Sequence, residues 1–427
     1  MGDRMQPSPA PAKSHVVAHT VLAETVAAPS SGPQRAGISP MAASMPEARG
    51  MSSVRTTVLP RIEVNGADAQ VVFDGKERFE KLKLLGEGGL GEVVGALDHD
   101  IGRKVAIKRL HAHIRHPAAL ARFVDEIRTI GKLEHPNIIP IHDVGTDENG
   151  EIYFVMKYVD GETLESIIEK LSAGDPAYHY QYTFERRVEI FRSILEALAF
   201  AHDKGIVHRD IKPANVMVGK YGEVLLMDWG VAKSLTSTTP EIPFVQENSA
   251  PPSPKSTARA FETQVGSLIG TPLYMSPEQA SGKPVDERSD VYSVSLLFYE
   301  LLYLRHPMAN KTSLDEVLQA ARTEEVDTFD RSHPHQPPVP VELMWFVKHG
   351  LEKDPTRRRQ SIRAMINVLD RRADGEICVE CPVTLAKATT MKGARFIDKH
   401  PAIFMTSATM FALFFVALVV FAIRGIA

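Results

Sequence analysis

The sequence predicts an α+β fold with one C-terminal transmembrane helix, and three observations support this. From about residue 78, the stretch "FEKLKLLGEGGLGEVVGALDHDIGRKVAIKRL" alternates apolar and polar residues around a cluster of glycines, as strands joined by a tight turn do. Further along, "FERRVEIFRSILEALAFAHDKG" places apolar residues at helical spacing. Residues 402–423 then form an apolar run without a single charge. A β-rich part therefore precedes a helical part, and an apolar helix follows both.

Composition and charge exclude little, but they argue against one class of partner. Of the 427 residues, 44% are hydrophobic and 24% are charged, which is ordinary for a globular protein. The net charge of -4 gives no reason to expect nucleic acid, because binding it requires a basic surface. Two cysteines, Cys378 and Cys381, provide no disulfide framework, which suits a reducing compartment.

Two polar stretches are expected to lie outside the packed core. Residues 1–70 are rich in Pro, Ala and Ser and show no sustained period. Such a segment cannot bury enough apolar surface to offset its ordering entropy, so we expect a disordered tail. A second polar stretch, residues 234–265, is expected as an insert in the globular part.

The glycine cluster matches a loop that binds phosphate. Gly86, Gly88 and Gly91 form G-x-G-x-x-G, and without Cβ atoms their backbone N–H groups can approach phosphate oxygens. A dinucleotide-binding fold shares this spacing but requires a helix directly after the loop. Here a strand-like run that includes Val93 follows instead, which argues against that fold.

A lysine and a glutamate further on are candidates for an ion pair. The apolar run "VAIK" ends in Lys108, which would be an ordinary exposed strand end unless a carboxylate lies near it. The stretch "AALARFVDEIRTIGKLEHPNI" has a helical pattern, and Glu126 lies off its apolar stripe, where it could face Lys108. The alternative is that Glu126 is a solvated helix residue.

Two charged loops carry the candidate chemistry. In "IVHRDIKPANVMV", Asp210 could accept a proton, Lys212 could neutralise a transferring phosphate, and Asn215 could donate an oxygen to a metal ion. In "LLMDWGVAK", Asp228 follows a short apolar run and precedes an aromatic residue and a glycine. Either loop, taken alone, could be an ordinary surface loop or turn.

Together these motifs, in this order, resemble the eukaryotic-type (Hanks-type) serine/threonine protein kinases, of the bacterial membrane-anchored kind, over residues 79–370. The resemblance implies a bilobal kinase fold with a small β-rich N-lobe and a larger helical C-lobe. It also implies ATP as substrate, Mg²⁺ as cofactor and proteins as phosphate acceptors. Asp210 and Lys212 would be catalytic, and Asn215 and Asp228 would bind the metal. The residues implied at the ATP site are Leu85, Gly86, Gly88, Gly91, Val93, Ala106, Lys108, Glu126 and Met156.

Other segments extend the resemblance through the C-lobe. "GTPLYMSPEQ" is similar to the end of a kinase activation segment, and "KDPTRRR" to the segment whose arginine, here Arg358, pairs with Glu278. "DERSDVYSVSLLFYELL" resembles the buried helix that anchors this lobe and contains Asp290. Trp229 stands where the family has Phe, and it still offers a large apolar surface. By resemblance to bacterial members, Thr263 and Ser267 are candidate autophosphorylation sites.

Alternative functions stay open at this stage. A pseudokinase that acts as a membrane scaffold would be favoured by the loss of Lys108, Asp210, Asn215 or Asp228, all of which are present. A kinase for small molecules is the other alternative, although Lys212 matches the protein-directed class. The C-x-x-C pair, Cys378 and Cys381, could be half a zinc site, but no second cysteine pair accompanies it.

The apolar run predicts how the protein is located. At about 1.5 Å per residue, a helix over residues 402–423 spans a hydrocarbon core of ~30 Å. More basic residues precede this run than follow it, so the kinase part is expected in the cytoplasm of a single-pass protein of the cell membrane. Residues 373–401 are expected as a tether, with no folded domain on the outer side. Anchoring would raise local concentration and favour self-association for autophosphorylation between copies.

Overall fold

The structure is a computed structural model. It describes the residue ranges 57–59, 61–65, 68–72, 77–88, 91–111, 114, 117–147, 149–230, 233–234 and 272–426. The candidate phosphorylation sites Thr263 and Ser267 lie outside these residues, as does the predicted insert after its first residue. Most of the predicted tail also lies outside them.

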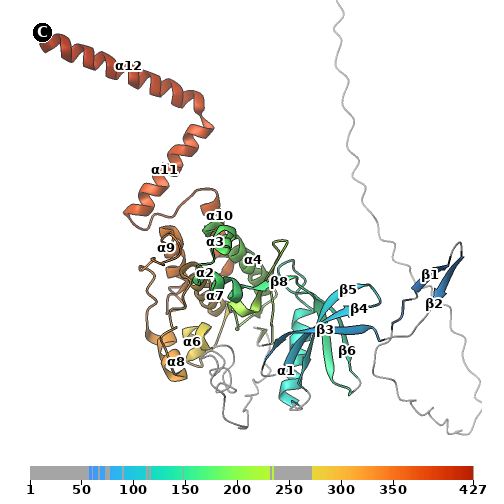
Figure 1. Ribbon diagram of the computed structural model, residues 1–427. Helices are drawn as coiled ribbons and strands as arrows, with labels where there is room; N and C mark the ends of the chain where they lie inside the picture. The colour runs from blue at the N-terminus through green and yellow to red at the C-terminus, as the bar shows by residue number, and fades with distance from the viewer. Residues whose placement is uncertain are drawn as a thin grey trace, which may run out of the picture. The chain divides into compact units, whose positions relative to one another are not determined.

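The first folded part is a five-stranded antiparallel sheet with one helix (Figure 1), and its strands β3, β4 and β5 are those that the alternating pattern predicted. The strand order is β3-β4-β5-β7-β6. Helix α1 packs against β7, and the rings of Phe123 and Phe154 lie 5.4 Å apart. The bounds are β3 Phe79–Glu87, β4 Gly91–Asp98, β5 Arg103–Leu110, α1 Pro117–Ile130, β6 Ile141–Thr146 and β7 Ile152–Lys157.

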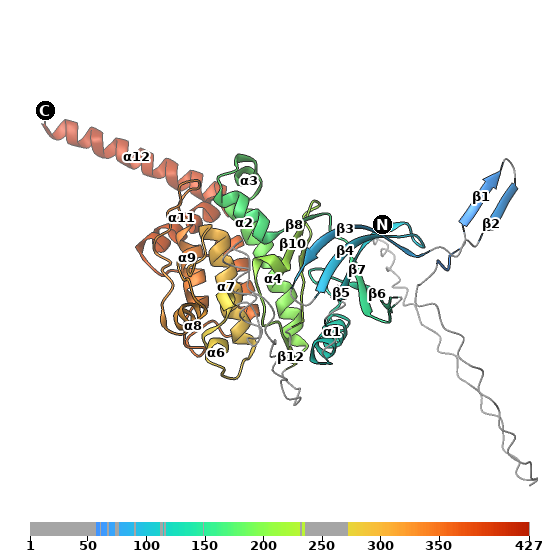
Figure 2. The ribbon, with the colours of Figure 1, turned by 60° about the horizontal axis from the view of Figure 1, so that its bottom comes forward.

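The second part is mainly helical and contains most of the apolar core. Helices α4 and α7 lie side by side in its centre (Figure 2). The rings of Phe191 and Phe298 stack 3.8 Å apart across them, and Phe346 of α9 packs edge-on against both. The helices are α2 Leu164–Ser172, α3 Pro176–Gln181, α4 Phe184–Asp203, α6 Pro277–Ala280, α7 Glu287–Tyr303, α8 Leu314–Thr323, α9 Val341–Gly350 and α10 Ile362–Ala373.

The predicted helix "FERRVEIFRSILEALAFAHDKG" has clear end signals. Thr183 caps its start by accepting a hydrogen bond from the N–H of Arg186. Gly205, with φ of 69°, follows its end in the left-handed conformation that glycine tolerates best. The face between these ends buries Phe191, Ile194 and other apolar residues, so the periodicity and the caps agree.

Short strands between the helices carry the loops of interest. They are β8 Gly161–Thr163, β9 Ile206–Val207, β10 Val216–Gly219, β11 Val224–Leu226 and β12 Lys233–Ser234, with 3₁₀ turns at Pro213–Asn215 and Pro272–Tyr274. Backbone hydrogen bonds join β11 to the segment that precedes β6: the N–H of Leu226 donates to Asn137 O at 2.8 Å, and that of Ile139 to Leu226 O at 3.2 Å. The two parts are therefore joined directly beside Asp228.

The N-terminal side differs from the sequence expectation. Strands β1 (Arg61–Asn65) and β2 (Asp68–Val72) form an antiparallel hairpin within the region expected to be a disordered tail up to residue 70. For residues 61–70 that expectation was wrong. The missed signal is the two-residue link Gly66-Ala67 between the paired residues Asn65 and Asp68, because glycine at the first position of such a link favours a hairpin.

The C-terminal side is helical. Helix α11 (Pro382–Lys399) occupies most of the predicted tether, and α12 (Pro401–Ile426) contains the predicted apolar run. Over residues 401–418 the mean hydropathy is 1.9 and the side chains are not buried, so α12 is long and apolar enough to cross a membrane.

Candidate active site

The glycine loop lies between β3 and β4, and its glycines are needed for two different reasons. A Cβ on Gly91 would lie 2.2 Å from the carbonyl oxygen of Arg109, so only glycine allows the strands to approach this closely. A Cβ on Gly86 would meet nothing within 4 Å, and one on Gly88 would meet only the Gly91 oxygen at 3.9 Å. The backbone at Gly86 and Gly88 is thus open to a ligand.

Strand register places the residues expected at the nucleotide on one face of the sheet. Val93 lies opposite Lys108, and Ala106 lies opposite Met156. Partners in an antiparallel ladder share a face, as do residues two apart on a strand, so all four side chains share one face. Ala106 and Met156 are buried, whereas Leu85 on β3 is 40% exposed. Around these residues the face is apolar except for Lys108, and Lys104, two residues before Ala106, lies at its exposed end.

Lys108 joins three elements. Its Nζ lies 2.6 Å from Oε1 of Glu126 on α1 and 2.9 Å from Oδ1 of Asp228, which follows β11. The contact that the sequence suggested between Lys108 and Glu126 is therefore present. Burial opposes the ammonium, but Asp228 and Glu126 hold the pKa of Lys108 above its usual value.

The two carboxylates differ in pKa because their surroundings differ. Burial raises the pKa of Glu126, against the opposing pull of Lys108. Lys108 lowers the pKa of Asp228 to about 2, so this carboxylate is ionised at neutral pH. The side chain of Asp228 is 43% exposed and that of Glu126 only 6%. Asp228 is consequently the carboxylate that a bound ligand can reach.

The loop after β9 brings Asp210, Lys212 and Asn215 together. Asn215 Nδ2 donates to the backbone oxygen of Asp210 at 2.9 Å and to its Oδ2 at 3.2 Å. Lys212 Nζ lies 3.3 Å from the same Oδ2. These contacts fix the orientation of a carboxylate that is 8% exposed. With its NH₂ group engaged, Asn215 has its carbonyl oxygen left to coordinate a cation.

Two residues of this site have unusual backbone geometry. Arg209 has φ of 70° and Asp228 has φ of 62°, and non-glycine residues rarely adopt such values. Asp290 on α7 stabilises the first of them, since its carboxylate accepts hydrogen bonds from the N–H groups of His208 and Arg209 at 2.8 and 2.9 Å. His202 Nε2 lies 2.8 Å from the same carboxylate. Sequence reasoning identified Asp290 as an anchor but missed this role of His202.

We expect Asp290→Asn to impair both stability and catalysis. Both carboxylate oxygens of Asp290 face N–H donors, so an amide NH₂ would face a donor in either orientation. One unmade buried hydrogen bond costs about 1–3 kcal/mol, and the distortion would reach Asp210. The measurements are urea unfolding and the rate of phosphate transfer.

Asp286→Asn is the matched control for Asp290→Asn. Asp286 caps the same helix by accepting from the N–H of Arg288, and Asn is an equally good cap. Equal losses in the two variants would show that Asp290 has no special role in positioning the loop.

The residues after Asp228 pack tightly. Trp229 is buried, and its ring lies 4.4 Å from that of His208. His208 Nε2 is 3.1 Å from Met227 O, which only accepts, so Nε2 carries the proton and Nδ1 can accept from the N–H of Asp210. A Cβ on Gly230 would lie 3.1 Å from Glu126 Oε2. Tryptophan therefore replaces phenylalanine here without leaving the core.

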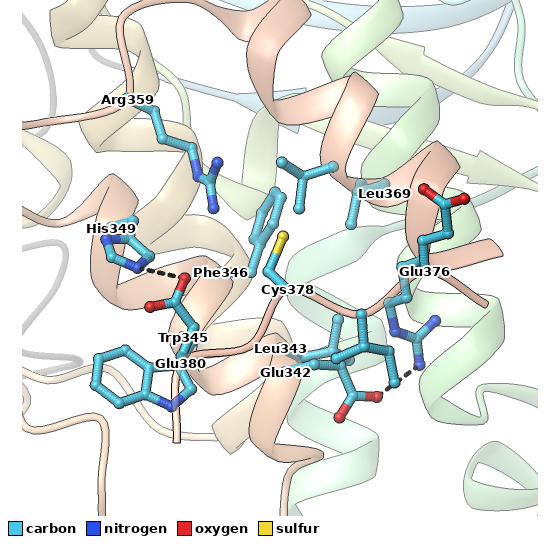
Figure 3. A pocket seen from close by; sticks show the side chains of 13 residues that line it. Glu342, Leu343, Trp345, Phe346, His349, Arg359, Leu369, Glu376, Cys378 and Glu380 are labelled. Atoms are coloured by element: carbon cyan, nitrogen blue, oxygen red, sulfur yellow. Dashed lines mark hydrogen bonds and ion pairs between the residues drawn. The ribbon is translucent and has the colours of Figure 1, made fainter. Parts of the chain in front are cut away.

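A separate cavity of about 30 Å³ lies between α9, α10 and the segment before α11 (Figure 3). Cys378 lines it beside Phe346 and Arg359, and His349 pairs with Glu380 at 3.3 Å. Cys381 is instead the N-cap of α11. Among the described residues, no group of three His, Cys, Asp or Glu side chains could hold a metal ion, so the structure offers this cysteine pair no further ligands. This cavity contains none of the candidate catalytic residues.

The residues of the candidate site fit a nucleotide with a hard cation. The amide oxygen of Asn215 and the carboxylate of Asp228 are oxygen ligands, and Mg²⁺ is commonly held by one or two such groups together with phosphate oxygens. The glycine loop, the apolar part of the sheet face and Lys108 come from the first folded part, and Asn215 and Asp228 come from the second. A two-lobed fold with these groups between its lobes defines an ATP-dependent phosphotransferase.

The chain belongs to the protein kinase family, since the model of the protein kinase domain matches residues 79–368. It is 34% identical to the serine/threonine-protein kinase PknD of Protochlamydia amoebophila over 70% of its own length and 30% of the relative's. It is 37% identical to a probable serine/threonine-protein kinase, SCO3848, of Streptomyces coelicolor, over 71% of its own length and 40% of the relative's. It is 35% identical to the serine/threonine-protein kinase PknB of Mycolicibacterium smegmatis, over 76% of its own length and 48% of the relative's. The chain thus spans less than half the length of each of these relatives.

Proposed function

We propose that the protein transfers the γ-phosphate of ATP to serine and threonine hydroxyls of proteins. The observation that carries this proposal is the contact of Lys108 with both Glu126 and Asp228, beside a loop in which Asn215 and Lys212 hold Asp210. A pseudokinase scaffold would lack part of this set. The relatives' names as serine/threonine-protein kinases support the choice of acceptor.

Each group has a distinct role in the proposed mechanism. The backbone of Gly86 and Gly88 and the ammonium of Lys108 position the phosphates of ATP. Asn215 and Asp228 would hold Mg²⁺, which supplies charge neutralisation at the phosphates. Asp210 orients the acceptor hydroxyl and takes its proton as the oxygen attacks phosphorus in line with the leaving ADP oxygen. Lys212, beside Asp210, stabilises negative charge on the transferring group.

The direct test is incubation of the purified full chain with labelled ATP, Mg²⁺ and a protein acceptor. We expect label on serine and threonine, and its loss when the metal is chelated, because Asn215 and Asp228 alone cannot neutralise the phosphates. Readdition of Mg²⁺ should restore the rate. ATP binding without any transfer would favour the scaffold, and label on a small molecule but not on protein would indicate a different acceptor.

Autophosphorylation is part of the proposal. The segment between Asp228 and Glu278 is rich in Ser, Thr and Pro, and we propose Thr263 and Ser267 as its phosphorylation sites. A phosphate brings nearly two negative charges and could order this segment against a basic side chain such as Arg209. Peptide mapping in the same experiment tests this, and phosphate confined to residues 1–70 would contradict it.

We further propose that α12 spans the cell membrane with the kinase domain in the cytoplasm. The helix is apolar enough, and Lys387, Lys392, Arg395 and Lys399 precede it while only Arg424 follows, which orients a span with its N-terminal side inside. Anchoring would raise local concentration and favour phosphorylation between neighbouring copies.

Anchoring predicts a clear difference between the full chain and a chain that ends at Lys399. The full chain should stay with membranes after alkaline washing, whereas the shorter chain should be soluble and still active. At matched bulk concentration the shorter chain should autophosphorylate more slowly. A full chain that fractionates as soluble, or a shorter chain without any activity, would contradict the proposal.

A further inference from the structure

Helix α11 has two faces with different surroundings. One face docks on the C-lobe: Thr384 and Ala388 are buried, and Lys387 Nζ lies 2.6 Å from Oε1 of Glu342 on α9. Further along the helix, Arg395 lies 3.9 Å from Glu376. These contacts fix the rotation of α11 about its own axis relative to the kinase domain.

The other face of α11 is apolar and exposed. Leu385 and Phe396 lie 11 residues apart, which is about three helical turns, so they share this face with Thr389 and Gly393 between them. Leu385 is 53% exposed, Phe396 51% and the neighbouring Ile397 37%. No charged side chain lies within the face, although Lys392 and Lys399 border it.

Chain connectivity indicates what covers this face. Helix α11 ends at Lys399 and α12 begins at Pro401, so a single residue, His400, separates the helix that carries the apolar face from the helix proposed to span the membrane. The charged residues of α11 are four basic side chains and one acid, Asp398. Basic residues at the border of an apolar face are typical of helices that lie in the interface of anionic bilayers, where long side chains reach the headgroups.

We propose that the face formed by Leu385, Thr389, Gly393, Phe396 and Ile397 lies in the interface of an anionic bilayer, with the kinase C-lobe docked on the opposite face. This inference rests on the proposed membrane span. It means that α11 is a rigid interfacial element and not a free tether. The salt bridge from Lys387 to Glu342 then fixes which side of the C-lobe, that of α9, faces the lipid.

Tryptophan quenching in the full chain tests the proposal. In vesicles of phosphatidylcholine and phosphatidylglycerol brominated near the headgroup, we expect Leu385→Trp to gain blue-shifted emission that bromine quenches. Asp398→Trp is the matched control, because residue 398 lies outside the apolar face although it is 13 residues closer to α12 than residue 385. Emission of the unsubstituted chain corrects for Trp229 and Trp345. Autophosphorylation of each variant shows that the kinase is folded.

The outcomes separate this inference from the membrane span itself. Phe411→Trp, within α12, should be quenched by bromine deep in the bilayer whenever the span is inserted. Quenching at residue 411 without quenching at residue 385 would overturn the interfacial placement and leave the span intact. Equal quenching at residues 385 and 398 would also overturn it. A blue shift at residue 385 that increases with protein density but is not quenched by bromine would overturn it too, because it would indicate contact with a second copy of the chain.

Discussion

Lys108→Met is expected to reduce phosphate transfer by at least about 10²-fold while the fold persists, because one preorganised charge at a transferring group contributes on this scale. Lys108 Nζ is the common partner of Glu126 and Asp228, at 2.6 and 2.9 Å. Methionine keeps an unbranched side chain that is one atom shorter and lacks the ammonium.

The fold should tolerate this change because Glu126 can become neutral. Burial already raises the pKa of Glu126 while Lys108 opposes the shift, so loss of the ammonium removes the main force that keeps this carboxylate ionised. A protonated Glu126 next to Asp228 avoids the repulsion of two adjacent negative charges. Thermal unfolding should therefore show a modest loss, in contrast to the large loss of rate.

Lys104→Met is the control for Lys108→Met, with the same substitution on the same strand. Lys104 is exposed near the ring of Tyr158, so its loss should leave the rate near that of the unsubstituted chain. Initial rates at saturating ATP and the KM for ATP are the measurements. Near-normal transfer by Lys108→Met would refute the role assigned to Lys108. Asp210→Asn should lose transfer because the base is removed, and Asp228→Asn because a metal ligand is weakened.

The largest expected loss of stability follows Arg358→Met. The guanidinium of Arg358 donates to both carboxylate oxygens of Glu278, at 2.8 and 3.1 Å, and both side chains are almost fully buried. It also donates to the backbone oxygens of Arg288 and Glu352, at 2.6 and 2.9 Å. Removing one partner of a buried pair leaves the other charge uncompensated and costs about 3–5 kcal/mol.

Urea unfolding measures this loss, and Arg363→Met is its matched control. Arg363 pairs with Asp203, but their side chains are 62% and 50% exposed, and such surface pairs contribute about 0–1 kcal/mol. The double variant Arg358→Met/Glu278→Gln should recover part of the loss because no buried charge remains. Equal effects of the two arginine substitutions would show that the buried pair does not hold the end of the activation segment.

The order of motifs and the local periods were readable from the sequence. Alternation around the glycines predicted β3 to β5, and helical spacing predicted α4. The apolar run that became α12 was equally plain. These features depend on neighbours within a few residues, so the sequence contains their full physical cause. The hairpin β1–β2 was of the same kind, and the glycine in its two-residue link was missed.

Contacts between distant segments were decided only by tertiary structure. Lys108 and Asp228 are 120 residues apart, and Arg358 and Glu278 are 80 apart, so no local pattern encodes their distances. The resemblance to kinases suggested the second pair, but not the number of donors that surround Glu278.

By itself, then, the sequence determined which side chains could carry the chemistry, because motif spacing reports residue type and local conformation. The positive φ of Arg209 and Asp228 is different, since neither residue favours it and Asp290, from α7, supplies hydrogen bonds that hold Arg209. The docked face of α11 is likewise determined by Glu342 of α9 and not by its own sequence. Packing between elements decided both. A strained backbone conformation, or the docking of one particular helix face, persists only where contacts with distant parts of the chain offset its free-energy cost.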